Sequence, residues 1–124
     1  MTNKKTIHSI LLVEDEAPLA NVLTDELKNN GFSVVHAENG DAALEDVKKK
    51  QFDLILCDIV MPEMDGFETL ENMRKANITT PVIMLTNLSQ EEEKAKAKKL
   101  GALDYIVKSA TSLADIIQKI KSIS

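Results

Sequence analysis

The 124-residue chain lacks the features that define several specialised classes of protein. Its single cysteine, Cys57, cannot form an intramolecular disulfide, and tryptophan is absent. No apolar run approaches the roughly 20 residues that span a bilayer, and residues 1–8 are too polar for a secretory signal peptide. These absences argue against a disulfide-stabilised scaffold and a helical membrane protein, so we expect a cytoplasmic protein without membrane contact.

The charge balance and the scarcity of aromatic residues are equally informative. Aspartate and glutamate number 20 against 15 lysines and arginines, which gives a formal net charge of −5. Domains that bind nucleic acid usually carry a basic footprint, so we expect no direct nucleic-acid binding. Aromatic residues make up 3% of the chain and hydrophobic residues 44%, which indicates a core of aliphatic side chains. The length predicts one domain over residues 1–124.

Five short apolar segments alternate with helix signals along the chain. An almost uninterrupted apolar run that is bounded by polar residues is typical of a strand buried on both faces. Such runs predict strands at residues 9–13, 33–37, 53–57, 82–85 and 105–107.

The segments between these strands carry the signals of helix starts. Pro18 fits the first turn of the first helix. Asp65 and Ser112 are predicted N-caps of the third and fifth helices, and Ser89 with Glu92 forms a predicted capping box for the fourth. The first helix is expected to bury a stripe made of Leu19, Val22, Leu23 and Leu27.

Strands that alternate with helices predict an α/β fold. We expect a flavodoxin-like (βα)5 arrangement, a doubly wound parallel five-stranded sheet with helices on both faces. Right-handed crossovers leave few strand orders, and the order 2-1-3-4-5 is a known one for such sheets. Ligands bind there outside the carboxyl ends of the strands, near the point where the strand order reverses.

Polar side chains stand at the ends of four predicted strands. Glu14 and Asp15 follow the first strand, and Asp58 follows the third. Thr86 follows the fourth strand and Lys108 the fifth. In the order 2-1-3-4-5 the first and third strands are neighbours, so we expect the three acids to converge with the hydroxyl and the ammonium beside them.

This set of groups predicts metal-assisted phosphoryl chemistry. Three carboxylates repel one another and would stay partly protonated unless a cation joined them, and oxygen ligands suit Mg²⁺. A hydroxyl and an ammonium beside such a site can stabilise a transferred phosphoryl group. Asp58 would be the nucleophile and form an acyl phosphate without a general base, because a carboxylate is ordinarily ionised at neutral pH.

Each residue also has an ordinary explanation when it is taken alone. Acids after the first strand are often solvated, or they favour a helix start through its dipole. Thr86 would then be a strand-end residue and Lys108 an exposed lysine. Their combination at one edge of a sheet favours a functional site.

These motifs resemble the receiver domains of two-component response regulators, the CheY-like family, over essentially the whole chain. The resemblance rests on LLVEDE at residues 11–16, DIVMPEMDG at 58–66, LT at 85–86 and GALDYIVK at 101–108. It implies that Asp58 accepts a phosphoryl group from a sensor histidine kinase or a histidine phosphotransfer protein. It also implies that Asp15 and Asp58 bind Mg²⁺, with Glu14 acting through water and the Val60 carbonyl as a further ligand.

The resemblance further implies a conformational switch. Thr86 would bond to the phosphoryl group, Lys108 would pair with it, and Tyr105 would turn inward as the switch aromatic. The fourth helix, fifth strand and fifth helix would form an output face for a downstream protein target or an effector domain. The protein would then be a phosphorelay signalling domain rather than an enzyme, either a monomer or a phosphorylation-dependent dimer.

Two positions depart from the family pattern. Ser109 follows Lys108, where proline is usual, so we do not expect the family's usual loop geometry there. Asn87 follows Thr86, where a small residue is usual, and we expect it to crowd the site or to form a hydrogen bond.

Two other functions remain open at this point. A Mg²⁺-dependent phosphatase or phosphotransferase with an aspartyl nucleophile usually needs a second acid just after the nucleophile, and the sequence Asp58-Ile59-Val60 has none. A degenerate receiver that serves as a binding module would be expected to lack one of the site residues, and all of them are present.

Overall fold

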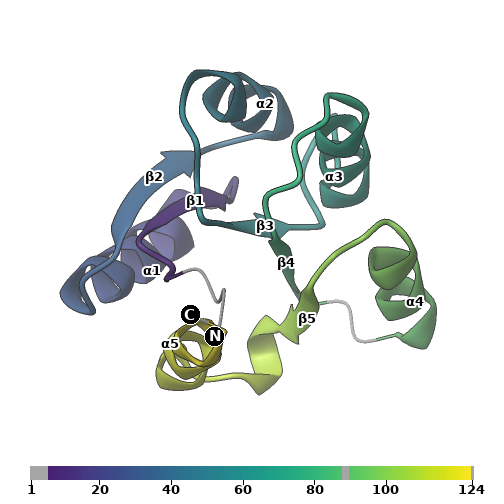
Figure 1. Cartoon of the computed structure of the whole chain (residues 1–124). Helices are drawn as coiled ribbons and strands as arrows, with labels where there is room; N and C mark the ends of the chain where they lie inside the picture. Colours follow the sequence, from purple (N-terminus) through teal and green to yellow (C-terminus); the bar gives the residue numbers. More distant parts are fainter. Residues whose placement is uncertain (1–5, 88–89, 124) are drawn as a thin grey trace, which may run out of the picture.

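The computed structural model of the chain describes residues 6–87 and 90–123. Five parallel strands form one sheet in the order β2-β1-β3-β4-β5 (Figure 1), which confirms the predicted order. The strands are β1 Ser9–Val13, β2 Ser33–Ala37, β3 Leu54–Asp58, β4 Val82–Thr86 and β5 Asp104–Val107.

Five α-helices cover the two faces of this sheet, as expected (Figure 1). They are α1 Ala17–Asn29, α2 Gly40–Lys49, α3 Gly66–Lys75, α4 Glu91–Lys99 and α5 Leu113–Ser122, and a short 3₁₀ helix, η1, covers Lys108–Ala110. Helices α1 and α5 pack on one face, and α2, α3 and α4 pack on the other. Successive strand residues alternate between the two cores, which is why the strands are apolar throughout.

Two of the predicted helix caps are present. The side chain of Asp65 accepts a hydrogen bond from the backbone N–H of Glu68 at 2.9 Å. Ser112 accepts one from the N–H of Asp115 at 3.1 Å. Each bond satisfies one of the first N–H groups of its helix, which have no partner within the helix.

Two local predictions are wrong. Val22 does not belong to the buried stripe of α1, because its side chain is 50% exposed while Ala20, Leu23 and Leu27 form the buried face. The N-cap of α4 is Gln90, one residue after the expected cap, so the predicted capping box does not start this helix. Ser89 itself lies outside the described residues.

The third and fourth strands end one residue later than predicted, and this places two site residues within the sheet. Asp58 is the last residue of β3 and pairs with Leu85 of β4. Thr86 is the last residue of β4 and pairs with Val107 of β5. Both residues are therefore held by the strand ladder rather than by a loop.

Arg74, in the last turn of α3, connects the two loops that precede β4 and β5 at the amino-terminal end of the sheet. Its guanidinium donates to the carbonyls of Ile78 at 2.8 Å, Thr80 at 3.0 Å and Gly101 at 3.3 Å. Partial burial lowers the pKa of this group from its ordinary value. Planar guanidinium groups suit such multiple contacts because their N–H donors point in fixed directions.

Replacing Arg74 tests this connection. We expect Arg74→Ala to lower the free energy of unfolding by about 1–3 kcal/mol, because hydrogen bonds from a charged donor to three carbonyls are lost. Urea denaturation measures the change. The control is Lys75→Ala, which removes an exposed 3.5 Å ion pair with Glu71 and should change stability by less than about 0.5 kcal/mol. Equal losses in the two variants would contradict this role of Arg74.

Candidate functional site

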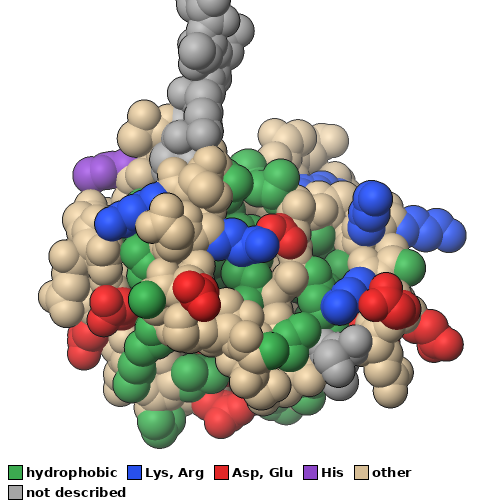
Figure 2. All heavy atoms as spheres, turned by 90° about the horizontal axis from the view of Figure 1, so that it is seen from below, with side chains coloured by type: hydrophobic (Ala, Val, Ile, Leu, Met, Phe, Trp, Pro, Cys, Tyr) green, Lys and Arg blue, Asp and Glu red, His purple; other side chains and the backbone are tan. Residues whose placement is uncertain are grey.

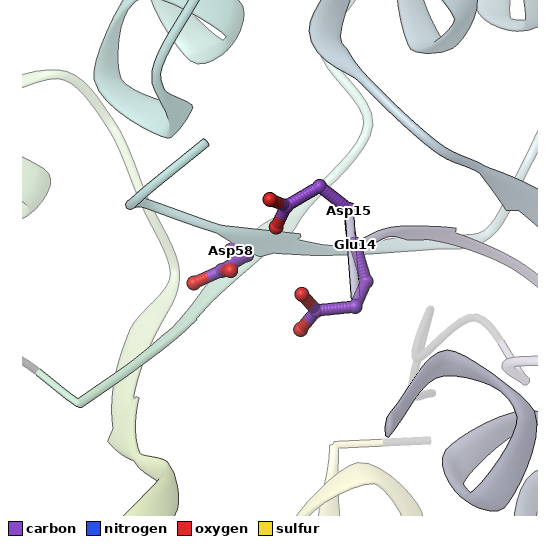
Figure 3. A group of neighbouring side chains, drawn as sticks. All are labelled: Glu14, Asp15 and Asp58. Carbon is purple, nitrogen blue, oxygen red and sulfur yellow. The ribbon is translucent and has the colours of Figure 1, made fainter. Parts of the chain in front are cut away.

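The three predicted acids converge beyond the ends of β1 and β3. Val13, the last residue of β1, pairs with Cys57 of β3. The residues that follow them, Glu14 and Asp58, are therefore neighbours. One carboxylate oxygen from each of Glu14, Asp15 and Asp58 lies within 4.8 Å of the others. The three carboxylates point into one shared space (Figure 3).

Lys108 enters this cluster from the start of η1. Its Nζ lies 2.8 Å from Oε1 of Glu14 and 3.4 Å from Oδ2 of Asp58. The lysine side chain is 13% exposed, and both carboxylates are buried. One ammonium therefore contacts two buried acids, and with Asp15 the site holds more negative than positive charge.

The environment of Asp58 favours its protonated form. Burial raises the pKa of Asp58 to about 7, the negative charge of Glu14 contributes to the rise, and Lys108 opposes it. The predicted partial protonation of the acid cluster agrees with this shift. The shift runs against the expectation that Asp58 is already ionised at neutral pH, because burial beside Glu14 favours the protonated form while no cation is bound.

The environment of Glu14 and Lys108 favours the charged form of both groups. Burial would raise the pKa of Glu14, but hydrogen bonds from Lys108 and from the Glu16 N–H outweigh it and lower the pKa. Burial would lower the pKa of Lys108, but its contacts with Glu14 and Asp58 raise it. Glu14 and Lys108 thus form the ion pair, and Asp58 is the group that titrates near neutral pH.

The site fits a hard divalent cation. Oδ1 of Asp15 is buried, and among the described residues it has no hydrogen-bond partner. A buried oxygen in this condition is unusual unless it serves a ligand. Both oxygens of Glu14 are occupied, one by Lys108 and the other by the Glu16 N–H at 3.2 Å. Asp15 and Asp58 are therefore the acids that could hold Mg²⁺ directly, and the oxygen-only donor set suits that ion.

The remaining predicted residues surround this cluster at different depths. Thr86 is fully buried at the end of β4, next to the Leu85 that pairs with Asp58. Tyr105 is half-buried on β5 and packs against the core under α2, α3 and α4. Val60 lies two residues beyond Asp58 with a side chain that is 61% exposed, and the role of its carbonyl stays a prediction.

Two residues outside the predicted site also shape the backbone here. A Cβ on Gly66 would overlap the Asp58 carbonyl and lie 2.7 Å from Cα of Ile59, so only glycine allows this close approach. The ring Nε2 of His36 lies 2.7 Å from the carbonyl oxygen of Glu14. The pairing of Leu12 with His36 puts this histidine beside the end of β1, but that signal exists only once the register is known.

Comparison with known proteins places these features in one family. Residues 10–121 match the family model described as the response regulator receiver domain. The chain is 44% identical over 99 residues to the transcriptional regulatory protein ZraR of Klebsiella oxytoca, covering 80% of this chain and 22% of that protein. It is 34% identical over 113 residues to the regulatory protein VanRc of Enterococcus gallinarum, covering 91% of this chain and 48% of that protein. The chain thus spans between about a fifth and a half of the length of these relatives.

A solved structure supports the same comparison. The chemotaxis protein CheY4 of Vibrio cholerae superposes with a TM-score of 0.87 at 28% identity, over 95% of this chain and 99% of that one. Within residues 6–87 and 90–123, no helix is both long enough and apolar enough to cross a membrane.

The pKa of Asp58 predicts how stability depends on pH without Mg²⁺. The carboxyl has a pKa of about 7 in the folded chain against an ordinary value of 3.8, so the folded state binds more protons between these values. Stability should therefore fall as the pH rises from about 4 to 7 and change little above pH 7 through this group. Asp58→Asn has no carboxyl to titrate at this position. The free energy of unfolding of the variant, relative to that of the wild type, should therefore increase by about 2–4 kcal/mol as the pH rises from 4 to 7.

Urea denaturation in EDTA at several pH values measures this difference. The control is Asp25→Asn, which changes an exposed acid on α1 and should follow the wild type. If the free energies of unfolding of the wild type and Asp58→Asn changed with pH in the same way, the raised pKa of Asp58 would be contradicted.

Proposed function

The chain belongs to the response regulator receiver domain family, and on that premise we propose that it is a phosphorylation switch whose phosphoacceptor is Asp58. The observation that carries the proposal is the cluster itself. Asp58 ends a central strand, lies 3.4 Å from Lys108, and shares with Glu14 and Asp15 a space that could hold a cation. A domain of this kind is a signalling component of a two-component system rather than an enzyme.

The proposed reaction moves a phosphoryl group onto Asp58. A phosphohistidine of a sensor histidine kinase or a histidine phosphotransfer protein would be the donor, and we expect this encounter in the cytoplasm. A carboxylate oxygen of Asp58 forms the new O–P bond, the P–N bond breaks, and the imidazole nitrogen leaves with the electron pair. The raised pKa means that Asp58 must lose its proton before it can attack.

Mg²⁺ fits the acid cluster, and when bound it would neutralise negative charge on the carboxylates and the phosphoryl oxygens. Asp15 and Asp58 would hold it directly, Glu14 through water, and the Val60 carbonyl would complete the protein's share. Release of the Asp58 proton would accompany binding, because a carboxyl must ionise to act as a ligand.

Lys108 and Thr86 would stabilise the product. The ammonium, which contacts Glu14 at 2.8 Å, has only to shift toward Asp58 to pair with a phosphoryl oxygen. Thr86 stands at the end of the neighbouring strand, from which its hydroxyl would bond to a second oxygen. The phosphoryl group adds nearly two negative charges, which is enough to bias a switch between two conformations.

The expected output face lies around α4, β5 and α5. A hollow of about 310 Å³ between α4 and β5 is lined by residues that include Lys94, Lys98, Leu103 and Tyr105. Tyr105 would transmit the change at Thr86 to this surface by turning inward. On the side where α5 lies in Figure 1, positive and negative side chains are interspersed (Figure 2). The described residues on that side form no continuous basic field, which suits a protein partner better than nucleic acid.

The output partner would be a downstream protein or an attached effector domain. The relatives extend well beyond the region that they share with this chain, so a connected effector domain is one form of the proposal. The domain would act as a monomer or as a dimer that forms on phosphorylation.

The proposal is tested by the mass of the intact protein after incubation with acetyl phosphate, with Mg²⁺ and with EDTA. We expect one phosphoryl group on the wild type in Mg²⁺ and on the control Asp25→Asn, and none on Asp58→Asn. In EDTA the modified fraction should fall by at least about tenfold, because the carboxylates then repel the anionic donor.

Three results would contradict the proposal. A folded wild-type protein that binds Mg²⁺ but gains no phosphoryl group would support the binding-module alternative. Modification of Asp58→Asn would show that another residue is the acceptor. Equal modification in Mg²⁺ and in EDTA would exclude the proposed role of the metal.

A further inference from the structure

One hydrogen bond connects the two loops that carry Thr86 and Lys108. The side-chain oxygen Oδ1 of Asn87 accepts a hydrogen bond from the backbone N–H of Ser109 at 3.1 Å. Asn87 directly follows Thr86, and Ser109 directly follows Lys108. The bond therefore lies just beyond the last pair of the β4–β5 ladder, Thr86 with Val107, one residue further along the chain from β4 and two residues further along from β5.

The two partners of this bond are the two departures from the family pattern. A proline at position 109 would have no N–H to donate, and an alanine at position 87 would have no side-chain oxygen to accept. The unusual residue at each position thus supplies the group that the other requires. The expectation that Asn87 forms a hydrogen bond near the site is confirmed, and Ser109 is its partner.

The bond also gives a partner to one of the first backbone N–H groups of the helical turn that follows β5. Lys108, Ser109 and Ala110 form the 3₁₀ helix η1, and the first N–H groups of any helix have no partner within it. The residue that precedes η1, Val107, makes no side-chain cap hydrogen bond. Asn87 supplies the missing acceptor from the neighbouring loop, as an N-cap residue would from within its own helix.

We propose that Asn87 is a positioning residue for Lys108. The helical turn that it caps begins with Lys108, whose ammonium reaches Glu14 at 2.8 Å and Asp58 at 3.4 Å. By fixing the N–H of Ser109, Asn87 holds the backbone that carries this ammonium at a constant distance from the end of β4. The inference rests on the proposed function, because Lys108 matters here as the group that pairs with the phosphoryl oxygens.

A double-mutant cycle tests the proposal through the rate of phosphorylation by acetyl phosphate at saturating Mg²⁺. Asn87→Ala should lower the rate at saturating donor by roughly threefold to fivefold, the effect of losing one solvent-exposed neutral hydrogen bond. In a Ser109→Pro background the same substitution should have no effect, because the donor is already absent. Any separate effect of the proline ring is present in both members of that pair and cancels.

Two further measurements separate positioning from a general effect on the fold. Ser109→Ala keeps the backbone N–H and should retain the wild-type rate. Exchange of the Ser109 amide proton, followed by NMR, should become faster in Asn87→Ala, while circular dichroism and the urea midpoint stay close to the wild type.

Several outcomes would overturn the proposal. Equal slowing by Asn87→Ala in both backgrounds, or no slowing in the wild-type background, would show that the hydrogen bond does not position Lys108. A slow Ser109→Ala variant would assign the effect to the serine hydroxyl. If the wild type itself gains no phosphoryl group, the proposed function fails and this inference fails with it. If the wild type reacts and Asn87→Ala reacts equally fast, this inference alone fails.

Discussion

The contact of Lys108 with two buried acids is the interaction on which the site depends. Without the ammonium, Glu14 and Asp58 would be two buried carboxylates side by side. Isolated buried charges of one sign are strongly unfavourable, and the usual response is protonation of one of them. Here the lysine stabilises the ionised form of Glu14. Burial and the negative charge of Glu14 then raise the pKa of Asp58.

The sheet makes this arrangement possible because it fixes the acids on neighbouring strands. Parallel strands end at one edge, and the order β2-β1-β3-β4-β5 places the carboxyl end of β3 between those of β1 and β4. Asp58 is itself part of the ladder, and the absence of a side chain at Gly66 lets the following loop pack against its carbonyl. The acids therefore cannot separate to relieve their repulsion, and a cation or a proton must do so.

The sequence predicted most of this framework because apolar runs and strand-end acids are local signals. The strand order was predicted as a known order for such sheets, and the convergence of the three acids followed from that order; both agree with the structure. The exposure of Val22 and the cap at Gln90 were missed because they depend on how each helix is rotated and where it begins. The hydrogen bond between Asn87 and Ser109 was unpredictable in detail, because its partners lie 22 positions apart and meet only through the β4–β5 register.

Burial beside Glu14 favours the protonated form of Asp58 until a cation binds. The most direct test is an NMR titration of the Asp58 side-chain carboxyl carbon, in EDTA and in saturating Mg²⁺. We expect a pKa of about 7 for Asp58 without metal, and a carboxylate that stays ionised between pH 4 and pH 7 when Mg²⁺ is bound. A metal-free pKa near the ordinary aspartate value of 3.8 would show that burial does not favour the protonated form of Asp58, and a titration that Mg²⁺ leaves unchanged would show that the cation does not bind this carboxylate.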